Sequence, residues 1–200
     1  MAKSAPERIV ELAGKAGLLR PRDLDERGIP RFHLTGLVRE GRLLRVGRGL
    51  YMSADAQPTE HLALAEACKR VPHGVLCLLS ALQYHGLTTQ LPREVWLAIG
   101  VKARRPKVDV PAIRVCRFSG EALTAGVEDR RIEGVPVRVY NVPKTVADCF
   151  KYRNKIGLDV ALEALRDARR RRKCSADDLW KYAKTCRVAN VMRPYLEALG

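Results

Sequence analysis

The sequence has 200 residues, of which 46% are hydrophobic, and its 37 lysines and arginines against 22 acidic residues give a formal net charge of +15. This length accommodates a buried core in one or two small domains. Such an excess of positive charge is typical of proteins that bind a polyanion, and nucleic acid is the leading class of partner.

Neither a membrane segment nor a metal framework stands out in the sequence. The longest apolar stretch, Val75–Leu82, is far shorter than the roughly 20 residues of a membrane-spanning helix. The N-terminus lacks the apolar core of a secretory signal, so we expect a cytoplasmic protein without membrane contact. The six cysteines form no C-x-x-C pair, which disfavours zinc, and in a reducing cytosol they should act as small apolar side chains.

The first 56 residues predict three short helices followed by a β-hairpin. We expect helices over 9–16, 21–27 and 31–40, and strands over 43–46 and 50–52. Gly17 and Gly28 end the first two helices, and Gly47 and Gly49 flank Arg48 in the hairpin turn. This order of elements is that of a winged helix-turn-helix module. The polar stretch 53–58 marks a boundary, which gives two domains, 1–56 and 57–200.

The third helix predicts a surface that reads DNA. With Leu34 at the centre of its inward face, Leu37, Val38 and Gly41 fall beside it. The opposite face presents arginine, aromatic and small residues, which suit a major groove, while Arg48 is placed to reach phosphates or the minor groove. The candidate DNA-binding residues are Arg31, Phe32, His33, Thr35, Arg39, Arg42, Arg45 and Arg48. The alternative is a solvated helix face and an ordinary tight turn that happen to carry arginines.

The second segment predicts an α+β domain, so that the whole chain is of the α+β class. A helix capped by Thr59 and another around 80–84 come first. Strands are expected at 94–99, 113–118, 130–132 and 135–140, in a small, mostly antiparallel sheet. A helical C-terminal tail follows, with helices over 143–153, 157–170, 175–186 and 188–199. Ser175 and Asp178 are spaced as a capping box.

Positive charge also gathers in the second segment, which carries 26 basic and 15 acidic residues against 11 and 7 up to Ala56. The two densest clusters are Lys102, Arg104, Arg105 and Lys107 in a predicted loop, and Arg169, Arg170, Arg171, Arg172 and Lys173 at a helix end. Each is a candidate contact for nucleic acid or an acidic partner. The alternative is a loop and a helix end that charge keeps soluble. Because five adjacent cations repel one another, we expect an anion to compensate the second cluster.

Motifs for catalysis are absent from the sequence. It contains no G-x-x-x-x-G-K-[ST], G-x-G-x-x-G, G-x-S-x-G or H-E-x-x-H motif. The acidic residues show no spacing with a lysine that suits a metal-dependent nuclease, and Asp148 is expected at a solvent edge or a helix cap. We therefore expect no enzyme, no catalytic residue, no metal and no cofactor. A nuclease that the winged helix docks onto nucleic acid is the alternative.

Two stretches resemble the AbiEi antitoxins of bacterial type IV toxin–antitoxin (abortive infection) systems. They are Leu37-Val-Arg-Glu-Gly-Arg-Leu-Leu-Arg-Val-Gly-Arg-Gly-Leu-Tyr51 and Val139-Tyr-Asn-Val-Pro-Lys-Thr-Val-Ala-Asp-Cys-Phe150, the latter followed by a helical tail. The resemblance implies a winged helix that represses its own promoter at operator repeats in double-stranded DNA. It also implies a C-terminal domain that neutralises a nucleotidyltransferase-like toxin without a stable complex. A plain regulator without a toxin is a further alternative, and the sequence leaves the oligomeric state open.

Overall fold

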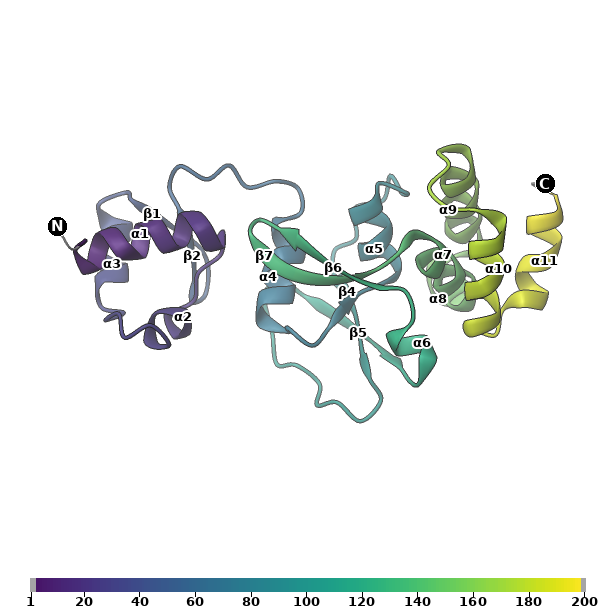
Figure 1. Ribbon diagram of the computed structural model, residues 1–200, viewed down its shortest axis with the longest axis horizontal. Coiled ribbons are helices and arrows are strands. Elements are labelled where there is room, and N and C mark those ends of the chain that lie inside the picture. Colours follow the sequence, from purple (N-terminus) through teal and green to yellow (C-terminus); the bar gives the residue numbers. More distant parts are fainter. Residues whose placement is uncertain (1–2, 199–200) are drawn as a thin grey trace. The chain divides into compact units, whose positions relative to one another are not determined.

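The computed structural model describes residues 3–198, and the chain divides there into two units (Figure 1). Unit 1 comprises the residues up to Arg70 together with Arg131–Pro136, and unit 2 comprises Val71–Arg130 and the residues from Val137 onward. Unit 1 thus extends past the polar stretch 53–58 and takes up a short piece from much later in the chain. Within the described residues, every helix is too short or too polar to span a bilayer.

Unit 1 contains the predicted three helices and hairpin, followed by a fourth helix. The elements are α1 (Ala5–Ala16), α2 (Pro21–Asp25), α3 (His33–Arg39), β1 (Leu43–Gly47), β2 (Leu50–Ser53) and α4 (Leu62–Arg70). α1 begins at a capping box between Ser4 and Glu7, and it ends where Gly17 adopts a φ of 68°. Leu19 pairs with Tyr51 through two backbone hydrogen bonds of 2.8 and 2.9 Å, which ties the start of α2 to the hairpin.

A small apolar core holds α3 against α1 and the hairpin. It consists of Ile9, Ala13, Leu19, Leu24, Ile29, Leu34, Leu37 and Leu43. The inward positions Leu34 and Leu37 are buried as predicted, and Val38 packs at the edge of the core. Gly41, which was expected on the same face, is exposed. The reason is that α3 ends at Arg39 and Gly41 takes a left-handed φ of 69° beyond it.

α4 begins at Leu62 and not at a Thr59 cap. The Thr59 hydroxyl instead donates to the Glu133 carboxylate and accepts a hydrogen bond from the His61 backbone N–H at 3.2 Å. Glu133 lies at the tip of the hairpin formed by β6 (Val127–Ile132) and β7 (Val135–Tyr140). This tip fits closely against the end of α1, because a Cβ on Gly17 would lie 1.4 Å from the Glu133 carbonyl oxygen. These contacts explain why 131–136 belongs to unit 1.

The five-stranded sheet has the order β5-β4-β3-β7-β6. Its further strands are β3 (Val75–Leu76), β4 (Val95–Gly100) and β5 (Ile113–Phe118). The expectation of a mostly antiparallel sheet is wrong, since β4 pairs with β5 and β3 with β7 in parallel, while β3 and β4 are antiparallel. Parallel neighbours need a long crossover connection, and segment 101–112 supplies one between β4 and β5.

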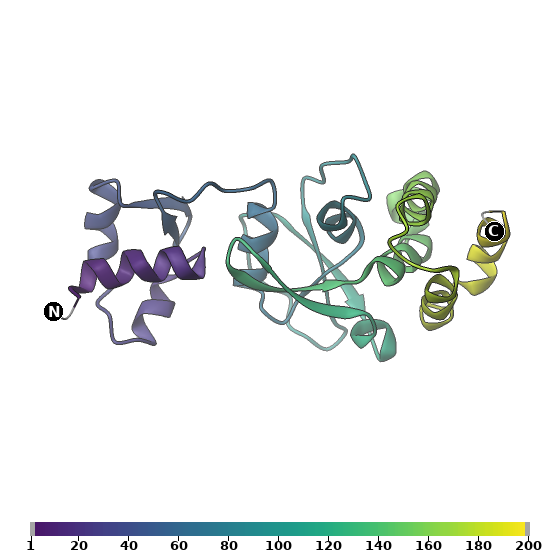
Figure 2. The same cartoon turned by 45° about the horizontal axis from the view of Figure 1, so that its top comes forward.

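The helices of unit 2 pack around α7. They are α5 (Leu78–His85), α6 (Glu121–Thr124), α7 (Val142–Lys151), α8 (Arg153–Ile156), α9 (Leu158–Arg170), α10 (Ala176–Thr185) and α11 (Ala189–Glu197). Every residue from Val142 to Phe150 is buried, because α5, α9, α10 and α11 all contact α7. Both views show α9, α10 and α11 gathered on the side of α7 away from the sheet (Figures 1 and 2). The predicted Ser175–Asp178 capping box is confirmed at the start of α10.

Candidate nucleic-acid interface

The outward face of α3 and the turns that flank the helix are exposed and carry unpaired cations. Arg31, Thr35 and Arg39 are exposed, and the Phe32 side chain keeps 71% of its surface accessible. Within residues 3–198, Arg31 and Arg39 make no side-chain hydrogen bond or ion pair, whereas Arg42 lies a long 3.9 Å from the Glu40 carboxylate. These guanidinium groups are therefore free to contact a ligand.

Two aromatic rings mark the beginning of α3. The Phe32 ring lies 4.0 Å from the His33 ring, centroid to centroid, with the planes tilted by 37°. His33 is half-buried, and Phe32 projects into solvent. This exposure leaves the Phe32 ring accessible for contact with a base or a thymine methyl group.

The β1–β2 turn forms a short wing that carries two further free arginines. Gly47 pairs with Leu50, so Arg48 and Gly49 form the turn, and Gly49 takes a φ of 65° that favours glycine. Arg45 and Arg48 are exposed, and in the described part of the chain neither side chain has an ion-pair partner. The structure thus brings the predicted residues of α3 and the wing together in unit 1, on one small core.

The basic cluster between β4 and β5 is a loop of exposed, unpaired cations. Lys102, Arg104, Arg105 and Lys107 are all exposed, and no ion pair involves them within residues 3–198. The base of this loop is fixed, because the Arg117 guanidinium donates to the carbonyl oxygens of Gly100, at 2.8 Å, and of Ala103. The cluster therefore presents its charge on an anchored loop.

The run Arg169–Lys173 differs, because most of its charge is used within unit 2. The Asp167 carboxylate lies 2.8 Å from the Arg170 guanidinium and 3.0 Å from that of Arg171. Arg171 also donates to the Gly86 carbonyl oxygen at 2.7 Å, and the Lys173 ammonium donates to that of His85. The anion expected to compensate this run thus includes Asp167 and the carbonyl end of α5.

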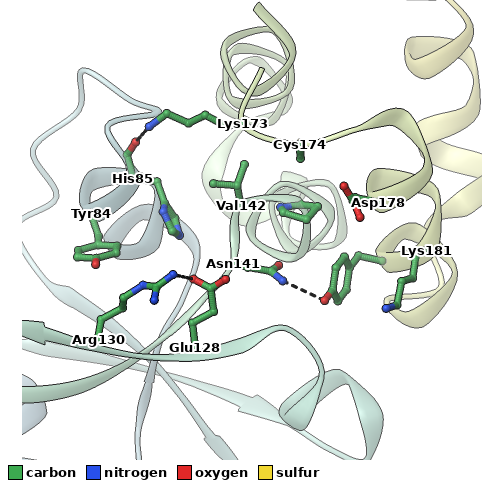
Figure 3. Close-up of a pocket in the computed structure, with 12 residues that line it drawn as sticks. Tyr84, His85, Glu128, Arg130, Asn141, Val142, Lys173, Cys174, Asp178 and Lys181 are labelled. Carbon is green, nitrogen blue, oxygen red and sulfur yellow. Dashed lines mark hydrogen bonds and ion pairs between the residues drawn. The ribbon is translucent and has the colours of Figure 1, made fainter. Parts of the chain in front are cut away.

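A polar pocket of about 600 Å³ lies where α5, β6, α7 and α10 meet in unit 2 (Figure 3). The Asn141 amide donates to the Tyr182 hydroxyl at 2.9 Å, and the Arg130 guanidinium lies 2.8 Å from the Glu128 carboxylate. Burial lowers the pKa of His85, and its Nε2 lies 2.7 Å from the Tyr140 carbonyl oxygen. Several polar groups of this pocket thus pair with one another, and no sequence motif marks the pocket.

A buried ion pair occupies the centre of α7. The Lys144 ammonium lies 2.6 Å from the Asp148 carboxylate, and both residues are almost fully buried. The Cys186 thiol donates to the same carboxylate at 3.2 Å. Burial raises the pKa of Asp148, although Lys144 acts in the opposite direction. The expectation that Asp148 faces a solvent edge or caps a helix is wrong, because α5, α9, α10 and α11 pack around α7 and bury its residues from Val142 to Phe150.

Acidic and metal-ligating side chains do not converge in the described part of the chain. No group of three or more His, Cys, Asp or Glu residues there is arranged to hold a metal ion. All six cysteines are free, and five of them are buried.

Comparison with known proteins identifies the N-terminal segment. Residues 7–54 match the family model described as "Transcriptional regulator, AbiEi antitoxin". The resemblance to AbiEi antitoxins is thereby confirmed for the segment that holds α1 to β2, whereas the second resembling stretch, 139–150, lies outside the match. A search of curated proteins finds no matching relative.

The fold of the chain is similar to that of a solved protein. The crystal structure of the RV2827C protein from Mycobacterium tuberculosis superposes with a TM-score of 0.59, covering 92% of this chain and 72% of that one. The sequences are 16% identical over this match, so the similarity concerns the fold.

Proposed function

From the match of residues 7–54 to AbiEi-type regulators, we propose that this protein is a DNA-binding transcriptional regulator that inserts α3 into a major groove. Four arginines carry the proposal, because they are exposed and lack ion pairs in the described structure. They are Arg39 on α3, Arg31 in the turn just before it, and Arg45 and Arg48 on the wing. Like charges gathered on α3 and the wing repel one another, and an anion that contacts them relieves this repulsion.

The two elements take different roles in this proposal. Arginine on a groove-facing helix forms two hydrogen bonds to guanine, and Phe32 and the Thr35 methyl group suit the methyl group of thymine. His33 and Arg42 flank this face. The wing arginines contact phosphates or the adjacent minor groove, which positions the protein without reading sequence.

Unit 2 offers a second surface for the nucleic-acid backbone. We place it on Lys102, Arg104, Arg105 and Lys107, since these cations are exposed and unpaired on an anchored loop. The run Arg169, Arg170, Arg171, Arg172 and Lys173 is the weaker candidate for such a contact, because Asp167 and the end of α5 engage three of its members.

The proposal also covers which promoter the protein regulates and whether it neutralises a toxin. The family description names a transcriptional regulator and an antitoxin, which supports these parts only in outline. We propose that the protein represses its own promoter and neutralises a nucleotidyltransferase-like toxin without binding it stably. Expression of the adjacent gene alone and together with this protein tests this part. Toxicity that the protein relieves supports the antitoxin, whereas a harmless neighbour leaves a plain regulator.

Binding to DNA is tested by fluorescence anisotropy with the full chain and duplexes from its own upstream region, against shuffled duplexes of equal length. We expect tighter binding to the upstream DNA and a steep loss of affinity with salt. Arg39→Ala should weaken the specific complex by about 1–3 kcal/mol. Arg8→Ala is the matched control, since Arg8 is an exposed arginine on α1 without an ion pair in the described structure. Equal losses for both variants would refute the assignment of α3 as the reading helix.

A further inference from the structure

The wing rests against a buried ion pair on α4, outside the segment that matches the family model. The Glu66 carboxylate, whose side chain is 8% exposed, lies 2.9 Å from the Arg70 guanidinium one turn further along the helix. The same Arg70 nitrogen donates a 3.0 Å hydrogen bond to the Arg48 carbonyl oxygen. A Cβ on Gly47 would lie 2.6 Å from the Glu66 carboxylate, so this group packs directly on the wing backbone.

α4 is itself fastened to α2. The Lys69 ammonium lies 2.8 Å from the Asp23 carboxylate, and the Arg20 guanidinium donates to the Lys69 carbonyl oxygen at 2.7 Å. Burial raises the pKa of Asp23, but hydrogen bonds from Lys69 and from the Arg20 backbone N–H outweigh this effect, and the net pKa is lowered. The ionised Asp23 therefore holds the C-terminal end of α4, from which Arg70 reaches the wing.

The pairing of the two wing strands alone fixes the tip of the wing only weakly. β1 and β2 form a separate two-stranded sheet, and such a hairpin is only marginally stable by itself. Its register is also irregular between Arg45 and Gly47. The contact from Arg70 falls on the backbone of Arg48, the residue whose exposed side chain the proposed function assigns to phosphate.

We propose that the Glu66–Arg70 pair is a positioning device for the wing, which holds the Arg48 backbone so that its side chain meets the nucleic-acid backbone in a fixed place. The binding half of this inference rests on the proposed function, and the structural half rests on contacts within unit 1. Arg70 acts through the wing and not directly, because its guanidinium is engaged by Glu66 and Arg48 and its side chain is only 21% exposed.

The structural half is tested without DNA, by hydrogen exchange of the wing peptide in the full chain. Arg70→Met removes the hydrogen bond to the wing, and we expect exchange of the amides near Arg48 to rise about 2- to 10-fold. Arg70→Lys, which keeps the charge and one donor, should restore part of the protection. Lys15→Met is the control, since Lys15 forms an i,i+4 ion pair with Glu11 on α1. Unchanged exchange in Arg70→Met would overturn the proposal.

The binding half is tested by a double-mutant cycle on a random-sequence duplex. Arg48→Ala should lower the slope of log K against log salt by about 0.9, the value for one phosphate contact. Arg70→Met should lower the slope by a fraction of this in the wild-type background, and it should change nothing further in Arg48→Ala. An equal effect of Arg70→Met in both backgrounds would show that Arg70 acts independently of the wing, and would overturn the inference.

The hydrogen-exchange experiment and the binding experiment can each refute their part of the inference independently. If the wild-type protein binds no duplex, the proposed function is refuted, while the exchange experiment still decides whether the Glu66–Arg70 pair holds the wing. If the wild-type protein binds but Arg48→Ala binds equally well, the positioning role in binding is refuted.

Discussion

Replacing Lys144 by methionine should strongly destabilise unit 2. The change keeps an unbranched side chain of similar length but removes the ammonium that lies 2.6 Å from the Asp148 carboxylate. It also removes the cation from above the rings of Tyr140 and Phe118, at 4.0 and 5.0 Å from their centroids. Asp148 would then be a buried carboxylate with only the Cys186 thiol as a side-chain donor.

The expected loss of stability follows from this burial. Lys144 is 0% and Asp148 2% exposed, so water does not replace the missing partner. Removing one member of a buried ion pair costs about 3–5 kcal/mol, because it leaves the other charge buried without a partner. For a unit of this size, such a loss corresponds to a decrease in Tm of about 10–20 °C.

The loss of stability in Lys144→Met should also depend on pH. Without Lys144, burial raises the pKa of Asp148 further above its value in the unfolded chain, so the folded variant retains its proton over a wider range. A carboxyl group with a raised folded pKa costs nothing below its unfolded pKa, and the cost grows as pH rises toward the folded pKa. Lys144→Met should therefore approach the wild-type Tm near pH 4 and fall behind it toward pH 7.

Thermal unfolding by circular dichroism measures both effects. Arg170→Met is the matched control in the same unit, because Arg170 pairs with Asp167 at 2.8 Å but its side chain is 73% exposed, and it should cost at most about 1 kcal/mol. The double variant Lys144→Met, Asp148→Leu should recover much of the loss, since a well-packed apolar pair replaces a buried ion pair at little cost. The reasoning is refuted if Lys144→Met is as stable as the control, or if the double variant is no more stable than Lys144→Met.

Three further outcomes are expected. Arg39→Ala should relax the preference for particular base pairs, whereas Arg48→Ala should weaken all duplexes nearly alike; anisotropy on matched and shuffled DNA separates the two. Arg171→Ser should lower the free energy of unfolding, measured by chemical denaturation, by about 0.5–1.5 kcal/mol, because it releases the end of α5. Arg172→Ser loses no such contact in the described structure and should change that free energy by less than about 0.5 kcal/mol. The pKa of Asp23 is lower in the folded protein than in the unfolded chain, so the ionised Asp23 stabilises the fold above its unfolded pKa, and this stabilisation is lost as pH falls through the folded pKa. A series of Tm measurements from pH 7 to 3 should show this loss in the wild type and not in Asp23→Asn.

Local signals predicted most of unit 1. Apolar spacing placed Leu34 and Leu37 inside, and glycines ended α1 and formed the turn of the wing, because these features depend on neighbours within a few residues. The exposure of Thr35 and Arg39 on the opposite face of α3 followed from the same periodicity. The extent of unit 1 did not, since the contacts of Lys69 with α2 and of Glu133 with Thr59 join segments far apart in the sequence.

Unit 2 shows where local patterns stop being informative. β3 is only two residues long, and its apolar neighbours in the sequence gave no strand period that could reveal it. Asp148 stands in an amphipathic pattern that normally indicates a solvated face, and only the packing of four helices around α7 buries it. The i,i+4 spacing of Lys144 and Asp148 is the one sequence signal that could have suggested their pairing.

The discontinuity of unit 1 has a consequence for its synthesis. Its last piece, Arg131–Pro136, is translated long after Arg70, yet its backbone fits against Gly17 and its Glu133 carboxylate binds Thr59. At roughly 5–20 residues per second, a ribosome needs on the order of several seconds to deliver that piece after α4 has been made. Unit 1, to which we assign the binding of DNA, therefore remains incomplete, with the end of α1 uncovered, until most strands of the sheet have left the exit tunnel.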